Sequence, residues 1–199
     1  MRVNARFFGL GAALALGITL ALLVALPSSA AGGAQHVRWD IISLAGGAPP
    51  GPMNAGGHAS ATAPNGETIT LTGSGHFVAP PSGGGSGAVD GGGTWMTSAG
   101  ASGTYTVTSL VSWENAGPQA AVPTFIDNID EGTRTNGTAV LTIAFSDGSQ
   151  GVLTIGCHGP GAPPGIFEGI ATTKGFKTYY TVQPPTSGVD ANRTVFHVR

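Results

Sequence analysis

Short segments in which apolar and hydroxyl side chains alternate recur along this sequence. In residues 103–113, for example, tyrosine, valine and tryptophan alternate with threonine and serine. Because successive side chains of a β-strand point to opposite faces, this alternation predicts strands with one buried face. The pattern predicts strands at 36–44, 67–78, 103–113, 138–145, 151–157, 167–182 and 193–198, with a further candidate at 92–98.

No window of the sequence repeats apolar residues at helical spacing over two turns. Short strands separated by Gly- and Pro-rich turns predict an all-β fold, a single antiparallel β-barrel or β-sandwich of about eight or nine strands. A Gly-x-aromatic pattern at 75–77, 93–95 and 103–105 favours the barrel. A ring beside a residue without a side chain lets a strongly bent sheet fill its interior.

The N-terminal segment carries export signals. Residues 7–26 form an uncharged apolar run that follows two arginines, and small residues then provide a site that signal peptidase accepts. We interpret residues 1–31 as a signal peptide. An uncleaved N-terminal anchor is the alternative, because the run is about long enough to span a bilayer. Residues 32–199 then form a single all-β domain, secreted or extracytoplasmic, with no membrane contact after cleavage.

Charge and cysteine content narrow the classes of partner. The formal net charge is −2, and no block of Lys or Arg is present in residues 32–199. A nucleic-acid partner is therefore not expected. The chain has one cysteine, so no internal disulfide holds the domain together.

That cysteine, Cys157, stands at the end of a predicted hairpin over 138–157. If Ser146, Asp147 and Gly148 form a three-residue loop with Gly148 left-handed, Leu141 pairs with Leu153. This register keeps all the apolar residues of the hairpin on one face. Cys157 is then a buried, small hydrophobic residue, and His158 points away from it. The core-facing set is Leu141, Ile143, Phe145, Leu153, Ile155 and Cys157.

Two groups of acidic residues are candidates for sites. Asp127, Asp130 and Glu131 lie within five residues and offer oxygen ligands of the kind that bind calcium. No cofactor is expected otherwise. A solvated acidic turn is the simpler interpretation. Glu168 lies in the apolar sequence IFEGI, where burial would raise its pKa. It is a candidate ligand-binding residue, or a catalytic one in the enzyme alternative.

Three aromatic residues, Trp95, Tyr105 and Trp113, are the candidate lining of a ligand site in a barrel mouth. The alternative for each is an ordinary place in the core. No histidine spacing typical of a zinc site and no nucleophile elbow is present.

From WDI at 39–41 through residues 157–176 to NRTVFHV at 192–198, the chain resembles a set of exported bacterial β-proteins of unknown function. The resemblance implies no activity and no site residue. In a barrel, the strand ending at 198 would pair with the strand starting near residue 36 and close the sheet.

These observations favour an exported binding or structural domain without intrinsic catalysis. Its partner would be a small molecule or a cell-surface component of unknown identity. The alternative is an enzyme, an isomerase or hydrolase, with a dispersed site in a barrel lumen that uses Glu168 and a histidine. A third interpretation is a surface-assembly protein that pairs through an exposed edge strand. The oligomeric state stays open.

Overall fold

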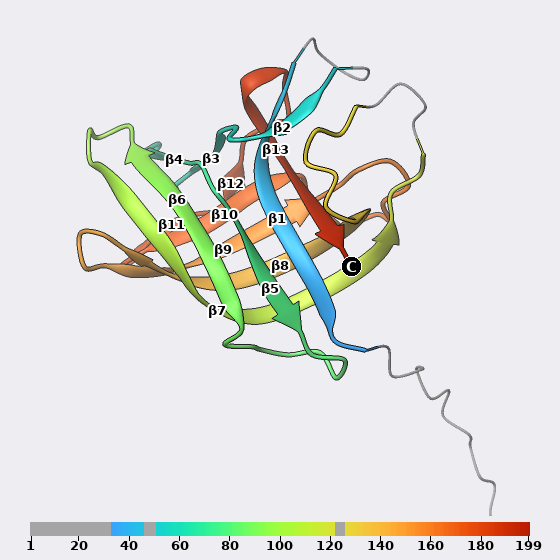
Figure 1. The fold of residues 1–199 in the computed structure, drawn as a ribbon. Helices are drawn as coiled ribbons and strands as arrows, with labels where there is room; N and C mark the ends of the chain where they lie inside the picture. The colour runs from blue at the N-terminus through green and yellow to red at the C-terminus, as the bar shows by residue number, and fades with distance from the viewer. Residues whose placement is uncertain (1–32, 46–50, 122–125) are drawn as a thin grey trace, which may run out of the picture. The chain divides into compact units, whose positions relative to one another are not determined.

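The computed structural model describes residues 33–45, 51–121 and 126–199 (Figure 1). The expected signal peptide or anchor at 1–31 lies outside the described residues. The described residues form strands and no helix, as the alternation predicted. Accordingly, they contain no helix with the length and hydropathy needed to cross a membrane.

Thirteen strands are present in the described residues. Their bounds are β1 (Gln35–Leu44), β2 (Met53–Ala55), β3 (Ala59–Thr62), β4 (Thr68–Leu71), β5 (Ser74–Ala79), β6 (Val89–Thr97), β7 (Ser102–Pro118), β8 (Thr133–Phe145), β9 (Gln150–Cys157), β10 (Gly169–Lys174), β11 (Lys177–Tyr179), β12 (Thr181–Val182) and β13 (Gly188–Val198).

Six of these strands close an antiparallel barrel. The ring runs from β8 through β13, β1, β5, β6 and β7 and back to β8. The expected pairing of the first and last strands is confirmed, with Trp39 opposite Phe196. The fold is therefore a barrel, the preferred of the two predicted architectures.

The other strands extend the sheet beyond the ring. β9, β10 and β11 continue from one edge of β8, and β4, β3 and β12 continue from β6. Only Tyr180 separates β11 from β12, so the hydrogen-bonded path begins and ends on the single stretch 177–182. Figure 1 shows β9, β10 and β11 on the side of the molecule away from β1 and β5.

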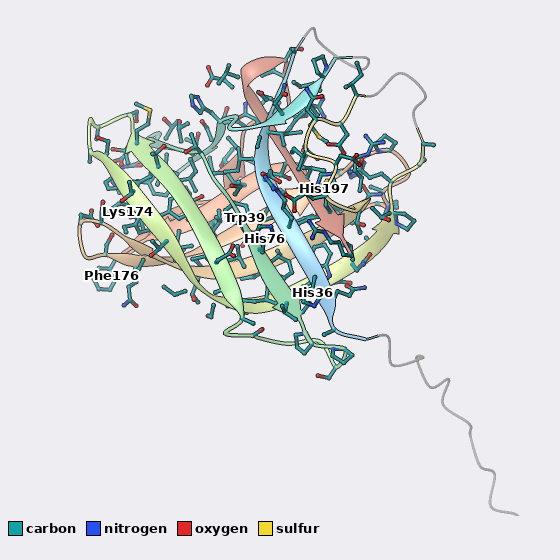
Figure 2. The ribbon with its side chains drawn as sticks, in the orientation of Figure 1. His36, Trp39, His76, Lys174, Phe176 and His197 are labelled. Carbon is teal, nitrogen blue, oxygen red and sulfur yellow. The ribbon has the colours of Figure 1, made fainter. Side chains whose placement is uncertain are left out.

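The prediction of eight or nine strands was too low, in part for two local reasons. The segment 67–78 divides into β4 and β5 at Gly73, whose φ is +153°. The segment 167–182 turns back at Gly175, with φ +58°, to form the β10–β11 hairpin. Phe176 at its tip is fully exposed and projects from the end of the barrel (Figure 2).

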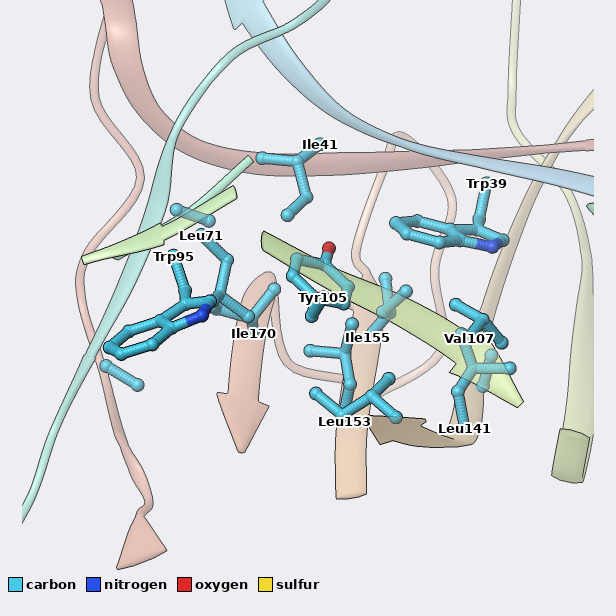
Figure 3. Packing of buried hydrophobic residues seen from close by; sticks show 14 of the residues in the cluster. Trp39, Ile41, Leu71, Trp95, Tyr105, Val107, Leu141, Leu153, Ile155 and Ile170 are labelled. Atoms are coloured by element: carbon cyan, nitrogen blue, oxygen red, sulfur yellow. The ribbon is translucent and has the colours of Figure 1, made fainter. Parts of the chain in front are cut away.

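The main core fills the space that the sheet encloses. It contains the inward-facing residues of almost every strand, including Trp39, Ile41, Leu71, Leu153 and Ile155 (Figure 3). The 138–157 hairpin has the predicted register. Leu141 pairs with Leu153, Gly148 has φ +86°, and the face ending in Cys157 is buried.

Glycines are placed where aromatic rings cross neighbouring strands. Gly75 of β5 pairs with Trp39 of β1, and an added Cβ there would lie 3.0 Å from the indole Nε1. Gly103 of β7 pairs with Trp95 of β6, with the same 3.0 Å approach. The ring that covers each glycine therefore comes from the adjacent strand, whereas the sequence pattern had suggested one on the same strand.

A second, smaller core lies on the opposite face of β1 and β13. It contains Ile42, Leu44, Met53, Ala191 and Val195, with Ile129 packed against it. Met53 is also hydrogen-bonded to the segment that follows residue 125, through Ile126 and Asn128. This outer apolar face forms one wall of the candidate site.

Candidate binding site

A cavity of about 420 Å³ lies between the outer face of β1 and β13 and the loop that follows β9. We call it the β1–β13 cavity. The described residues that line it are Ile42, Leu44, Met53, Gln119, the run Cys157–Ala162, Glu168, Arg193, Thr194 and Val195. The β1–β13 register places Ile42 opposite Arg193, and Arg193 shares a strand face with Val195.

Glu168 holds the polar wall of this cavity together. Its Oε1 accepts a hydrogen bond from the backbone N–H of Thr194 at 2.8 Å, and its Oε2 accepts one from His158 at 2.6 Å. The Thr194 hydroxyl donates to the carbonyl of Gly156 at 2.7 Å. The carboxyl group thus links the end of β9 to β13 through hydrogen bonds, although these two strands are not paired through their backbones.

Burial raises the pKa of Glu168 to about 7. The hydrogen bonds from Thr194 and His158 and the charges of Arg193 and His158 act in the opposite direction. Burial is the larger effect, so this carboxyl group changes its charge near neutral pH. Of the residues that the sequence suggested for ligand binding, Glu168 alone lines the cavity.

We expect the pH dependence of stability to report on Glu168. Its folded pKa of about 7 exceeds its ordinary value of 4.5, so between these values the folded protein binds more protons than the unfolded chain. Glu168 makes its full contribution to the free energy of unfolding below about pH 4.5. This contribution, at most about 3 kcal/mol, is lost as the pH rises through about 7. Urea unfolding across this range should show the decline in wild type and lose it in Glu168→Gln.

Glu114→Gln is the control for that measurement, since Glu114 is exposed on β7. It should keep the wild-type pH dependence. An identical decline in wild type and Glu168→Gln would show that another group titrates.

Cys157 and His158 are neighbours in sequence with different environments. Cys157 is 1% exposed, and its Sγ accepts a hydrogen bond from Gln119 Nε2 at 3.2 Å. Burial raises the pKa of the thiol, and the charge of Glu168 raises it further, so the nucleophilic thiolate is disfavoured. His158 is exposed, and its Nδ1 lies 2.8 Å from the carbonyl oxygen of Ile166. The two side chains form no reactive pair.

The three aromatic candidates lie away from the cavity. Trp95 and Tyr105 are 3% and 2% exposed and belong to the main core (Figure 3). Their polar atoms donate to backbone carbonyls of Thr104 and Thr72. Trp113 is partly buried against the same core, and its Nε1 donates to Gln35 at 2.8 Å. Their rings pack in the core and contribute nothing to the cavity lining.

The acidic candidates Asp127, Asp130 and Glu131 contact different partners and do not converge on one point. Asp127 lies 2.8 Å from Nε2 of the buried His197 on β13 (Figure 2), while Glu131 pairs with Arg38 and Arg199. Although burial opposes it, the hydrogen bond with His197 helps to hold the pKa of Asp127 below its ordinary value. Asp130 has a positive φ of 44° and contacts Asp127 through its backbone.

Within residues 33–45, 51–121 and 126–199, no three His, Cys, Asp or Glu side chains are placed to hold one metal ion. Calcium binding stays a prediction.

Sequence reasoning missed Arg193 and the apolar wall. None of Arg193, Ile42, Leu44 and Met53 was singled out as a site residue from the sequence. The proposed β1–β13 pairing was the available signal, because it places Arg193 beside Ile42.

Comparison of the chain with protein-family models, curated proteins and solved structures finds no match.

Proposed function

We propose that this chain is an exported binding domain without catalysis of its own, which holds a small amphipathic molecule in the β1–β13 cavity. The observation that carries the proposal is a cavity of about 420 Å³ with one apolar wall and one polar wall. This volume falls in the range of about 300–1,000 Å³ typical of small-molecule sites. The occupant is a free small molecule or the terminal group of a cell-surface component.

The two walls support an amphipathic occupant. Ile42, Leu44, Met53 and Val195 line the cavity from β1, β2 and β13, and they pack together in the second core. Arg193 lies beside Val195 and Ile42 on the β1–β13 face, and Glu168 and His158 add polar groups from the other lining segments. A ligand that is apolar at one end and polar at the other matches both walls.

The packing of the barrel also favours this location. Large side chains such as Trp39, Leu141 and Leu153 fill the interior, each fully buried. A ligand inside the barrel would have to displace close-packed core. The outer cavity needs no such displacement.

The test is a fluorescence titration with the neutral apolar probe N-phenylnaphthylamine. Wild type should bind one molecule saturably. Ala162→Trp, which fills the cavity from its loop, should weaken binding by about tenfold or more because it occludes the apolar wall. Ala99→Trp, at an exposed turn distant in sequence from the cavity lining, is the matched control and should bind as wild type does. Equal binding by both variants would contradict this location.

An enzyme is the second candidate, and the pKa of Glu168 is the observation that favours it. A carboxyl group with a pKa of about 7 beside His158 is suited to general acid–base chemistry. Both carboxyl oxygens already accept backbone hydrogen bonds, which supports the binding role instead. Turnover of an ester such as nitrophenyl butyrate that is lost in Glu168→Gln would favour the enzyme.

A further inference from the structure

Arg193 differs from the other basic side chains of the described residues. Five of these six lysines and arginines form an ion pair, namely Arg38, Arg134, Lys174, Lys177 and Arg199. Among the same residues, Arg193 forms no ion pair. Its one side-chain hydrogen bond runs from Nε to the carbonyl of Thr186 at a long 3.4 Å.

The position of Arg193 makes that difference informative. It is partly buried and lines the β1–β13 cavity, on the strand face of Val195 and opposite Ile42. A guanidinium group that is partly removed from water is stabilised by a counter-ion. Its planar donors fit a carboxylate, which accepts two parallel hydrogen bonds from them.

The remaining polar groups of the cavity do not supply that counter-ion. Glu168 is the only carboxyl group among the described lining residues, and its two oxygens accept the N–H groups of Thr194 and His158. Its charge acts on Arg193 only from beyond ion-pair distance. The guanidinium donors of Arg193 are therefore available to a ligand.

We infer that the ligand of the β1–β13 cavity is an amphipathic carboxylic acid, whose carboxylate pairs with Arg193 while its apolar tail packs on Ile42, Leu44, Met53 and Val195. This inference rests on the proposed binding function and adds the chemical class of the ligand. Apolar side chains and one arginine without an ion pair line the same cavity, which matches a molecule with one apolar and one anionic end.

Binding of such an acid should be coupled to protonation of Glu168. The titratable and charged groups that line the cavity are Cys157, His158, Glu168 and Arg193. A ligand carboxylate beside Arg193 disfavours the ionised form of Glu168, whose pKa is about 7. Complex formation then takes up a proton, so affinity should fall as the pH rises from about 6 to about 8.

The test compares two ligands with the same tail, decanoate and decanol, by displacement of N-phenylnaphthylamine from the full chain. Wild type should bind decanoate about tenfold or more tightly than decanol at about pH 6. Arg193→Met keeps the length of the side chain without its charge. It should lose this preference while its decanol affinity stays within about threefold of wild type. Arg193→Lys should recover part of the preference.

Arg199→Met removes an exposed arginine that lies outside the cavity and should keep the wild-type preference. Equal affinities of wild type for decanoate and decanol would overturn the carboxylate inference and leave the binding function intact. A decanoate preference that survives in Arg193→Met would overturn it as well. Failure of the probe itself to bind would contradict the proposed function.

Discussion

Gly75→Ala is expected to lower the free energy of unfolding by about 3 kcal/mol, one of the two largest effects we foresee. Gly75 lies between β1 and β6, and an added Cβ would lie 2.3 Å from the carbonyl oxygen of Asp90 and 2.7 Å from the Cα of Gly91. Both are backbone atoms of β6 and cannot move without separating the strands. Urea denaturation followed by tryptophan fluorescence measures the change.

Gly87→Ala is the matched control for this substitution. Gly87 is exposed in the loop before β6, and an added Cβ there meets no atom within 4 Å. Its stability should stay close to wild type. If Gly75→Ala also unfolds at the wild-type urea concentration, then β5 and β6 are less closely packed than the structure indicates.

Arg38→Met should destabilise the domain by about 4 kcal/mol. Arg38 donates from Nε and Nη2 to the two carboxyl oxygens of Asp40, at 2.8 and 3.0 Å. The Asp40 side chain has no exposed surface. Removal of the guanidinium therefore leaves a buried carboxylate without its ion-pair partner. Thermal and urea unfolding should both report the loss.

Two further variants separate this cause from lost packing. Arg199→Met removes a cation that pairs with Glu131 from a side chain that is 61% exposed, and it should change stability little. Asp40→Asn added to Arg38→Met should recover part of the loss, because it removes the unpaired charge. Strictly additive effects of the two substitutions would show that the ion pair is not the cause.

Local chemistry explains the parts of the fold that could be predicted. The register of the 138–157 hairpin depends on a three-residue turn and on alternation, and both can be read from neighbouring residues. The pairing of β1 with β13 was inferred because a barrel needs closure. Strand breaks at Gly73 and Gly175 were missed because the alternation continues through them. β3 was missed because its buried residues, Ala59 and Ala61, give a weak apolar signal.

The candidate site was harder to predict, because three distant segments form it. Glu168 was found from its apolar neighbours, a local signal. The Glu168 carboxyl group is held by hydrogen bonds from His158 and Thr194. These contacts depend on how distant strands are paired, which local sequence does not reveal. Trp95 and Tyr105 were candidate ligand contacts because the sequence alone does not show how deeply a side chain is buried. Their burial depends on how the whole sheet closes.

The closed path of the sheet has a consequence for how the domain folds. The hairpins β8–β9 and β10–β11 join near neighbours and can form early. The pairings β1–β13 and β3–β12 join segments from distant parts of the chain, so they carry the largest loop-closure entropy. We therefore expect a slow folder whose rate-limiting step includes the docking of β13. Until that step, the apolar faces of β1 stay open to solvent and to chaperones.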